Sequence, residues 1–246
     1  MDKITDRDAY KDACIVIPIY KDNIINLLNN DEIDSINNTL SLMHNYDIYF
    51  LCNDKLNLIY YKKLKSKYQH NVYFKYYNFN TFYEYSKMCL DYKFYQMFES
   101  YKYMLICQTD AWIFKDELLY WCNKGYDYIG SPWLNDFYEE NLKSEKINHI
   151  QKDNIRHYNG GFSLRNIKKF IDILSINNNI YSIYNMSEDL IISQVLTSYF
   201  KLPSYIDALN FSHEQTFSDN IYEKLRLPFG CHTEYTKNKL KEIYKI

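Results

Sequence analysis

The stretch Tyr103–Phe114, YMLICQTDAWIF, decides how the chain is expected to fold. Its first part, Met104–Cys107, is a short apolar run of the length and type that fits a buried strand. Three polar residues, Gln108–Asp110, follow it, and apolar character returns at Ala111. In an open α/β sheet, ligands bind outside the carboxyl ends of the strands. The polar triplet is therefore predicted to lie at a ligand-binding edge.

Asp110 is the residue of this triplet with the clearest chemical consequence. A carboxylate between two apolar segments is costly to desolvate unless something offsets the cost. A divalent metal ion carrying a diphosphate would do so. An aspartate that caps or turns the chain between two elements explains the same spacing equally well, so the residues alone leave both interpretations open.

Length and composition predict one domain that spans residues 1–246. The chain is 47% hydrophobic, enough to bury a sizeable core. Its net charge of -2 gives no electrostatic footprint for nucleic acid. The six cysteines form no CxxC pair and are expected to be reduced core residues. The polar first ten residues and the lack of a long apolar stretch predict a cytoplasmic protein with at most peripheral membrane contact.

Strand and helix patterns alternate before the opening stretch. Apolar runs closed by polar residues predict strands at Ala13–Ile19, Asp47–Cys52 and Asn71–Tyr76, and helical spacing is found in Ile24–His44, Leu56–Tyr68 and, as the longest helix, Thr81–Tyr101. This alternation predicts an α/β fold with a mostly parallel sheet and right-handed crossovers. The polar residues that follow the strands would then lie along one rim.

Two segments after the opening stretch carry candidate functional residues. Leu134–Tyr158 is polar and poorly periodic, and loops of that length are often lids or binding loops. The following segment, Asn159–Arg165 (NGGFSLR), holds two of the five glycines. Paired glycines permit positive φ and close approach of the backbone to a ligand. A tight turn into a strand at Phe162–Leu164 explains them equally well.

The last third of the chain contains an acidic pair and a lysine-bearing end. Ser187 precedes Glu188 and Asp189, which open an apolar helix expected at Leu190–Phe200. Acids in a first turn suit the helix dipole, so a structural role competes with a functional one. Lysines 237, 239, 241 and 245 could rest on an anionic membrane, although a solvated helix face is favoured.

An ordered series of motifs resembles a known family. The motifs are VIPIYKD (16–22), YMLICQTDAWIF (103–114), GYDYIGSPW (125–133), NGGFSLR (159–165), SEDLIIS (187–193) and PFGCH (228–232). The chain resembles an uncharacterised, domain-of-unknown-function family of GT-A-type glycosyltransferases from about Cys14 to about His232. The resemblance implies a GT-A-like, Rossmann-type sheet flanked by helices, with a core at about 13–232 and a C-terminal helix at 233–246.

The resemblance also implies a metal ion at the nucleotide-sugar donor. GT-A enzymes hold it with an Asp-x-Asp motif after a central strand, and the matching triplet here keeps only the final acid, Asp110. His232 falls where some GT-A families add a late histidine ligand. Asp110 and His232 are thus the implied ligands of Mn²⁺ or Mg²⁺, and imidazole suits Mn²⁺ better.

The remaining implied site residues bind the substrates or act as a base. Residues of a helix start that are adjacent in sequence point about 100° apart, so Glu188 and Asp189 cannot both face one ligand atom. The resemblance favours Asp189 as the catalytic base. Arg165 is expected to bind phosphate or to pair with a surface acid. The donor- and substrate-binding residues are expected to be Tyr20, Lys21, Asp54, Gln108, Thr109, Asn159, Gly160, Gly161 and Arg165.

These implications together predict a glycosyltransferase of glycan or polysaccharide biosynthesis. It would move a sugar from a nucleotide-sugar donor to a hydroxyl of a glycan or lipid-linked glycan, with metal assistance and inversion, although retention stays open. One alternative is a nucleotide-sugar-binding protein impaired in catalysis, because the first acid of the metal motif is missing. The other is a different nucleotide-using α/β transferase, which the lack of a GxxxxGK[ST] loop disfavours.

Overall fold

A computed structural model describes residues 10–20, 28–68, 71–133, 158–216 and 225–246. Its centre is a six-stranded mixed sheet with the strand order β3-β2-β1-β4-β7-β6. The strands are β1 (Ala13–Ile19), β2 (Asp47–Cys52), β3 (Val72–Tyr76), β4 (Tyr103–Cys107), β6 (Tyr128–Pro132) and β7 (Tyr158–Asn166). Strands β3, β2, β1 and β4 are parallel, and β7 runs antiparallel to both β4 and β6.

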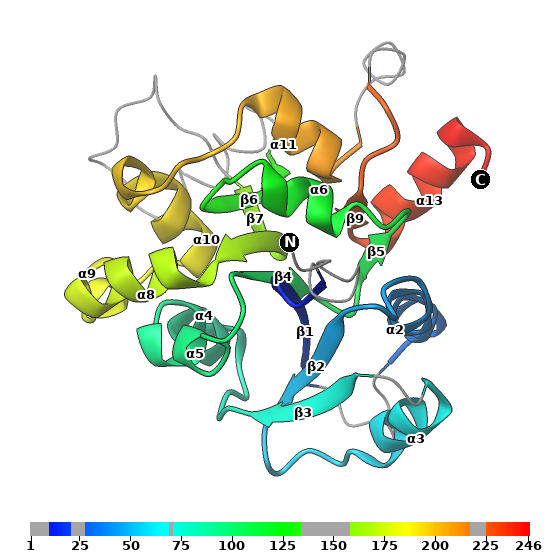
Figure 1. The fold of residues 1–246 in the computed structure, drawn as a ribbon, viewed down its shortest axis with the longest axis horizontal. Helices are drawn as coiled ribbons and strands as arrows, with labels where there is room; N and C mark the ends of the chain where they lie inside the picture. The colour runs from blue at the N-terminus through cyan, green and yellow to red at the C-terminus, as the bar shows by residue number, and fades with distance from the viewer. Residues whose placement is uncertain (1–9, 21–27, 69–70, 134–157, 217–224) are drawn as a thin grey trace, which may run out of the picture.

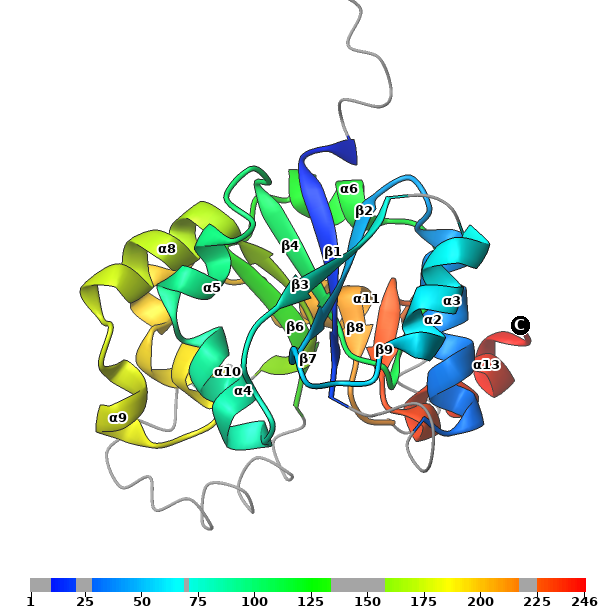
Figure 2. The same ribbon diagram turned by 90° about the horizontal axis from the view of Figure 1, so that it is seen from below.

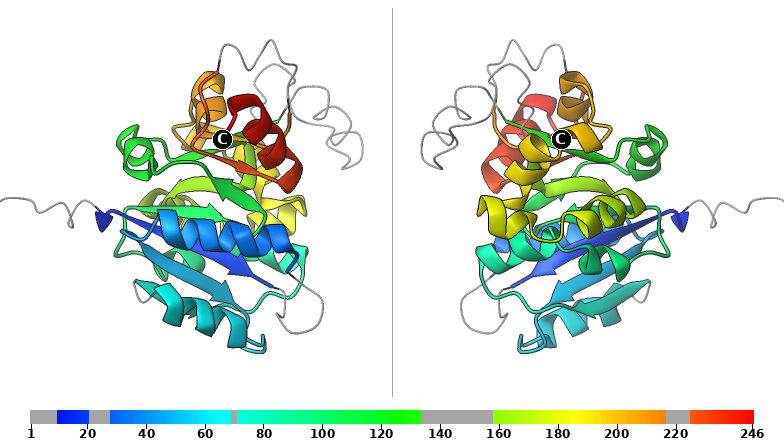
Figure 3. Two further views of the ribbon diagram at one scale, coloured as in Figure 1. Left: turned by 90° about the vertical axis from the view of Figure 1, so that its right-hand side faces the viewer. Right: turned by 90° about the vertical axis from the view of Figure 1, so that its left-hand side faces the viewer.

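Helices cover both faces of the sheet (Figure 1), because side chains of successive strand residues point to opposite faces. Ile15 and Ile17 of β1 pack into one apolar cluster with α2 (Asn30–Leu42) and α3 (Ile59–Tyr68). Cys14 and Val16 belong to the cluster on the other face, with α4 (Phe82–Cys89), α5 (Tyr92–Gln96) and α8 (Ile167–Ile176). Figure 3 shows α2 and α8 on opposite sides of the molecule.

A second, three-stranded sheet stands beside the first. Its order is β5-β9-β8, with β5 at Ala111–Ile113, β8 at Ser212–His213 and β9 at Gly230–His232. The other elements are α6 (Leu118–Asn123), α9 (Ile180–Tyr184), α10 (Glu188–Leu190), η2 (Ile191–Val195), η3 (Thr197–Tyr199), α11 (Tyr205–Phe211) and α13 (Glu234–Tyr244). Among the described residues, none of the helices is long and apolar enough to cross a bilayer.

The predicted strands are confirmed, and so is the mostly parallel α/β sheet. The single long helix expected at Thr81–Tyr101 is wrong, because Asp91 starts a new helix there. Its side chain accepts a hydrogen bond from the backbone N–H of Lys93 at 2.9 Å, which caps α5. The six cysteines are free and buried, as expected.

The apolar helix expected at Leu190–Phe200 is also wrong, since that segment divides into α10, the π-helical turn η2 and the 3₁₀ turn η3. Packing on the sheet prevails over local periodicity here. The Ser193 hydroxyl of η2 accepts a hydrogen bond from the backbone N–H of Tyr158, the first residue of β7, at 3.2 Å. π-Helical turns are frequent at functional sites.

Candidate functional site

The strand order places a crevice at the carboxyl ends of β1 and β4. The chain builds β1, β2 and β3 outward in one direction and then returns to add β4 on the other side of β1. Crossovers that leave in opposite directions open a crevice between the two strands, which is where doubly wound folds bind ligands. Tyr20 follows β1 at this point, and Gln108 and Asp110 follow β4.

Two cavities meet at Tyr20, which lines both of them. Tyr20 is 56% exposed. The first, which we call the aromatic chamber, has a volume of about 210 Å³ and is lined by Pro18, Tyr20, Phe79, Asn80, Thr81, Phe82, Tyr85 and Gln108. The second, the polar chamber, has a volume of about 230 Å³ and is lined by Tyr20, Asn29, Asp31, Glu32, Ser35, Asp110, Ala111, Thr233, Glu234 and Lys237. The aromatic rings therefore line one chamber and the charged groups line the other, with Tyr20 between them.

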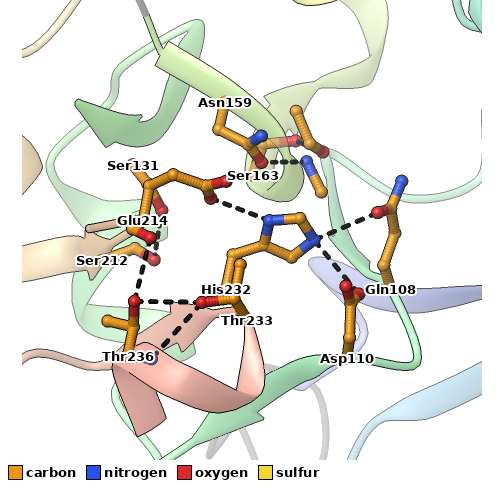
Figure 4. Close-up of polar contacts among 12 residues, drawn as sticks. Gln108, Asp110, Ser131, Asn159, Ser163, Ser212, Glu214, His232, Thr233 and Thr236 are labelled. Atoms are coloured by element: carbon orange, nitrogen blue, oxygen red, sulfur yellow. Dashed lines mark hydrogen bonds and ion pairs between the residues drawn. The ribbon is translucent and has the colours of Figure 1, made fainter. Parts of the chain in front are cut away.

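His232, the last residue of β9, lies against the triplet that follows β4 (Figure 4). Its Nε2 is 3.1 Å from Asp110 Oδ1 and 3.1 Å from Gln108 Oε1. Its Nδ1 is 2.7 Å from Glu214 Oε2. Burial alone would lower the pKa of His232, but the carboxylates of Glu214 and Asp110 raise that pKa well above its usual value.

The cluster can hold either a proton or a divalent cation, because its acceptors need a positive charge between them. If His232 donates Nδ1–H to Glu214, the lone pair of Nε2 faces the oxygens of Asp110 and Gln108, and these acceptors repel one another unless a proton or a cation lies there. Within the described part of the chain, no three His, Cys, Asp or Glu residues form a metal cluster. Asp110 and His232 would therefore share the ion with phosphate oxygens and water, as Mg²⁺ commonly does.

Glu214 was missed by the sequence reasoning. It follows β8 and meets His232 through the parallel pairing of β8 with β9. Residues 18 positions apart carry no local signal of such a contact. Only the strand order of the second sheet, which sequence patterns do not predict, brings the two together.

The glycine pair lies within strand β7, which excludes the alternative of a tight turn before the strand, and neither glycine has the positive φ that such a pair permits. The glycines instead allow side chains to approach the strand closely. A Cβ on Gly161 would lie 2.5 Å from His232 Nε2 and 2.8 Å from Gln108 Oε1. A Cβ on Gly160 would lie 2.8 Å from Glu188 Oε1 and 3.6 Å from the Cβ of Asp189. Both candidate groups, the histidine and the acidic pair, thus pack against β7.

Asn159, the neighbour of the glycine pair, supports this arrangement locally. Its side-chain oxygen accepts a hydrogen bond from the backbone N–H of Gly161 at 2.6 Å. The bond fixes the backbone that faces His232. Asn159 is half-buried and lines neither chamber.

Arg165 lies in the core, which contradicts the expectation that it binds phosphate or pairs with a surface acid. It is fully buried, and its Nη2 lies 3.8 Å from Oε1 of the buried Glu188. The guanidinium also donates hydrogen bonds to the Tyr95 hydroxyl at 2.9 Å and to the Ser163 hydroxyl at 3.1 Å. We call Arg165, Glu188 and Ser86 the buried charge cluster, because Ser86 Oγ donates to Glu188 Oε2 at 2.7 Å.

The two acids of α10 have different surroundings, as their helical spacing predicted. Burial and the nearby Asp189 raise the pKa of Glu188 to about 7, against the opposing effects of Arg165 and Ser86. Asp189 accepts a hydrogen bond from the backbone N–H of Leu190 at 2.8 Å, and burial raises its pKa also. Glu188 is therefore engaged within the core, while Asp189 is partly exposed and is not paired with Arg165.

Two expected donor-binding residues, Thr109 and Asp54, line neither chamber. The side chain of Thr109 is buried and donates to Glu32 Oε1 of α2 at 2.8 Å. Asp54 is exposed and lines neither chamber. Its neighbour Asn53 donates a hydrogen bond from Nδ2 to Oδ1 of Asn80, a residue of the aromatic chamber, at 2.7 Å. Lys21 lies outside the described residues, and so does most of the expected lid at Leu134–Tyr158.

The lysines of the C-terminal helix do not share one solvated face, which corrects the favoured expectation. Lys237 is 5% exposed, lines the polar chamber and forms an ion pair of 2.5 Å with Asp31. The hydrogen bond from Lys237 lowers the pKa of Asp31. Lys241 lies 3.9 Å from the centroid of the Trp112 ring. Lys245 is exposed at the end of α13.

Comparison with solved structures shows that the chain has the fold of GT-A-type glycosyltransferases. Galactosyltransferase LgtC, in complex with donor and acceptor sugar analogues, matches with a TM-score of 0.56 at 12% identity over 94% of this chain and 95% of LgtC. Mouse xyloside xylosyltransferase 1 matches with a TM-score of 0.51 at 10% identity, over 91% of this chain and 97% of the mouse chain. Core-mannan synthase A from Aspergillus fumigatus, in a Mn/GDP form, matches with a TM-score of 0.50 at 8% identity over 80% of this chain and 73% of the fungal chain.

The family itself follows from a match of the sequence. The chain belongs to the family described as "Protein of unknown function (DUF5672)", whose model matches residues 67–232. That range contains β4, the glycine pair, the acidic pair and His232. No curated protein matches the chain in a sequence search.

Proposed function

We propose that the protein is a glycosyltransferase that transfers a sugar from a nucleotide-sugar donor to an acceptor hydroxyl, with metal assistance and inversion. One observation carries the proposal. Asp110, Gln108 and His232 converge within 3.1 Å at the switch point between β1 and β4, beside two chambers of unlike character. A nucleoside diphosphate has an aromatic base that suits the aromatic chamber, and a divalent cation would let its diphosphate approach the carboxylates of the polar chamber.

The aromatic chamber suits the base of the donor. Phe79, Phe82 and Tyr85 line it with rings, and Asn80 adds an amide that both donates and accepts hydrogen bonds. Base stacking on aromatic side chains is worth about 1–3 kcal/mol per base. The shared Tyr20 would then direct the diphosphate from this chamber toward Asp110.

The metal ligands in this proposal are Asp110 and His232. A divalent cation bound there would offset the charge on the leaving diphosphate. Glu214 would hold the His232 ring with Nε2 toward the ion, as carboxylates that accept from metal-bound histidines do. Gly161 leaves the room that this ring orientation needs.

The proposed base is Asp189. The acceptor oxygen would form a bond to the anomeric carbon while the bond to the diphosphate oxygen breaks, and the departing diphosphate keeps that electron pair. Asp189 would take the acceptor proton, because Glu188 is engaged with Ser86 and Arg165 in the core. Burial raises the pKa of Asp189, which strengthens it as a base once it is ionised.

A donor panel tests the proposal. UDP-, GDP-, CMP- and dTDP-sugars are added to the protein with and without Mn²⁺, and thermal shift and nucleotide release are measured. We expect one donor class to raise Tm more strongly with Mn²⁺ and to release its nucleotide when acceptors are supplied. If no donor raises Tm, the proposal is wrong.

A nucleotide-sugar-binding protein without turnover is the second candidate. The observation that favours it is Gln108, an amide where an Asp-x-Asp motif has its first carboxylate. The same panel separates the two, since a donor that raises Tm without nucleotide release under any acceptor condition supports the binding protein.

A further inference from the structure

A third cavity lies on the far side of α4 from the aromatic chamber. Its volume is about 500 Å³, within the range of small-molecule sites. We call it the lateral cleft. Its walls come from the β3–α4 connection, α4, the α4–α5 connection, the start of α5, the α8–α9 connection and α9. The lining residues are Tyr77, Asn78, Glu84, Lys87, Met88, Leu90, Asp91, Tyr92, Lys93, Asn178, Asn179, Tyr181 and Ser182.

Helix α4 is the wall between the two cavities. Phe82 and Tyr85 line the aromatic chamber, whereas Glu84, Lys87 and Met88 line the lateral cleft. Successive helical residues turn by about 100°, so these two sets face different sides. Figure 2 shows α4 and α9 at the end of the molecule where β1 terminates. The lateral cleft is therefore distinct from the donor chambers but lies at the same end of the fold.

The charges of the lateral cleft balance. The lining contains two acidic residues, Glu84 and Asp91, and two basic residues, Lys87 and Lys93. A site for phosphate would need an excess of cations, and a site for a metal ion would need an excess of carboxylates. Balanced charges with many hydrogen-bonding groups suit a neutral, polar ligand.

Amide groups of the cleft are available for such a ligand. Asn178 and Asn179 are exposed, and their side chains make no hydrogen bond to another residue of the described chain. Their loop is nevertheless anchored, because Asn177 Nδ2 donates to the carbonyl of Ile173 at 2.9 Å. A carboxamide both donates and accepts, which matches the two capacities of a sugar hydroxyl.

Tyrosine rings provide the apolar part of the lining. The hydroxyl of Tyr77 donates to Asp91 Oδ2 at 2.9 Å, which holds that ring in place. Tyr181 packs edge-to-face on Tyr83 with ring centroids 4.9 Å apart. The buried Met88 and Leu90 complete this surface. Rings that are held by such contacts give a pre-organised surface for the C–H face of a pyranose.

We propose that the lateral cleft binds a neutral carbohydrate, as a subsite that holds a distal part of the glycan acceptor. The amides and balanced charges match sugar hydroxyls, and the fixed tyrosines match the apolar sugar face. That the glycan is an acceptor rests on the proposed function. The carbohydrate class itself rests only on the cleft.

The experiment is a binding screen of the full chain against neutral soluble oligosaccharides, followed by calorimetric titration of the tightest binder. The double variant Asn178→Ala/Asn179→Ala removes two exposed amides of the cleft and is expected to fold normally. The matched control is Asn238→Ala, which removes an exposed amide of α13 outside the cleft. We expect the double variant to bind about tenfold more weakly or worse, and the control to bind like the wild type.

The outcomes separate this inference from the proposed function. If no neutral oligosaccharide binds, or if the double variant binds as tightly as the wild type, the carbohydrate site is wrong. Nucleoside diphosphate binding should survive the double variant. Asp110→Asn should lose the Mn²⁺-dependent gain in that binding and should still bind the oligosaccharide. Oligosaccharide binding by a protein that binds no nucleotide supports the cleft and contradicts the proposed function.

Discussion

Arg165→Met is expected to destabilise the fold, and more strongly at pH 8 than at pH 5. The guanidinium is fully buried and donates hydrogen bonds to Tyr95, Ser163 and the carbonyl of Gly160. Its Nη2 lies 3.8 Å from Glu188 Oε1. Methionine fills similar space but has no donor and no charge, so the Glu188 carboxylate would be left buried without a counter-ion.

The size of this destabilisation follows from the loss of the buried ion pair between Arg165 and Glu188. Removing one partner of a buried ion pair typically costs about 3–5 kcal/mol. For a chain of this length each kcal/mol lowers Tm by about 2–4 °C, so at pH 8 we expect a fall of roughly 6–20 °C. The lost hydrogen bonds contribute at every pH, at about 1 kcal/mol each.

The pH dependence follows from the raised pKa of Glu188, which is about 7 in the fold. A carboxyl whose folded pKa exceeds its unfolded pKa favours the fold while it is protonated, and this contribution is lost as pH rises from the unfolded pKa through about 7. Near pH 5 the carboxyl is neutral and needs no counter-ion. At pH 8 the Glu188 carboxyl is charged, and only the wild type has the Arg165 guanidinium as its counter-ion.

Urea unfolding followed by circular dichroism at pH 5 and pH 8 measures the difference. Arg165→Lys is the control that keeps a charge but loses the planar set of donors. A loss below 1 kcal/mol, or an equal loss at both pH values, would refute the buried charge cluster. A phosphate-binding Arg165 would instead show weaker donor binding with unchanged stability in Arg165→Lys.

Two further predictions concern the catalytic side of the site. Asp189→Asn should lower kcat by about 10²–10⁴-fold with little change in donor Kd, measured by steady-state kinetics and calorimetry; wild-type turnover in Asp189→Asn together with lost turnover in Glu188→Gln would reverse the assignment. Gly161→Ala should abolish Mn²⁺-dependent donor binding, since its Cβ would lie 2.5 Å from His232 Nε2; unchanged calorimetric binding would show that the ring does not need its present position.

Much of the fold could be predicted because its strands are continuous apolar runs closed by polar residues. Ala13–Ile19 and Met104–Cys107 are buried throughout, as such runs require. The helices were less predictable. Asp91 interrupts an apparently continuous helical pattern by capping α5, and a contact between Ser193 and Tyr158 accompanies the π-helical turn. These outcomes depend on single hydrogen bonds, which periodicity does not register.

The sequence predicted a site residue reliably only where its position at the end of a strand fixed its place in the fold. The end of β4 places Asp110 on the rim directly, because carboxyl ends of parallel strands share an edge. The partner of Asp110, His232, lies 122 residues away and was suggested by resemblance alone. The charge of Arg165 suggested a ligand, but charge does not reveal burial. Its role in the core depends on Glu188, which joins β7 only through the tertiary fold.

Calorimetric titration of the nucleoside diphosphate of the best donor, with and without Mn²⁺, tests the central claim most directly. The claim is that Asp110 and His232 hold a metal ion on the diphosphate at the end of β4. The wild type should bind the nucleotide more tightly with Mn²⁺, and Asp110→Asn should keep its fold and lose that gain, with a milder loss in His232→Ala. An undiminished Mn²⁺ effect in Asp110→Asn would contradict the account.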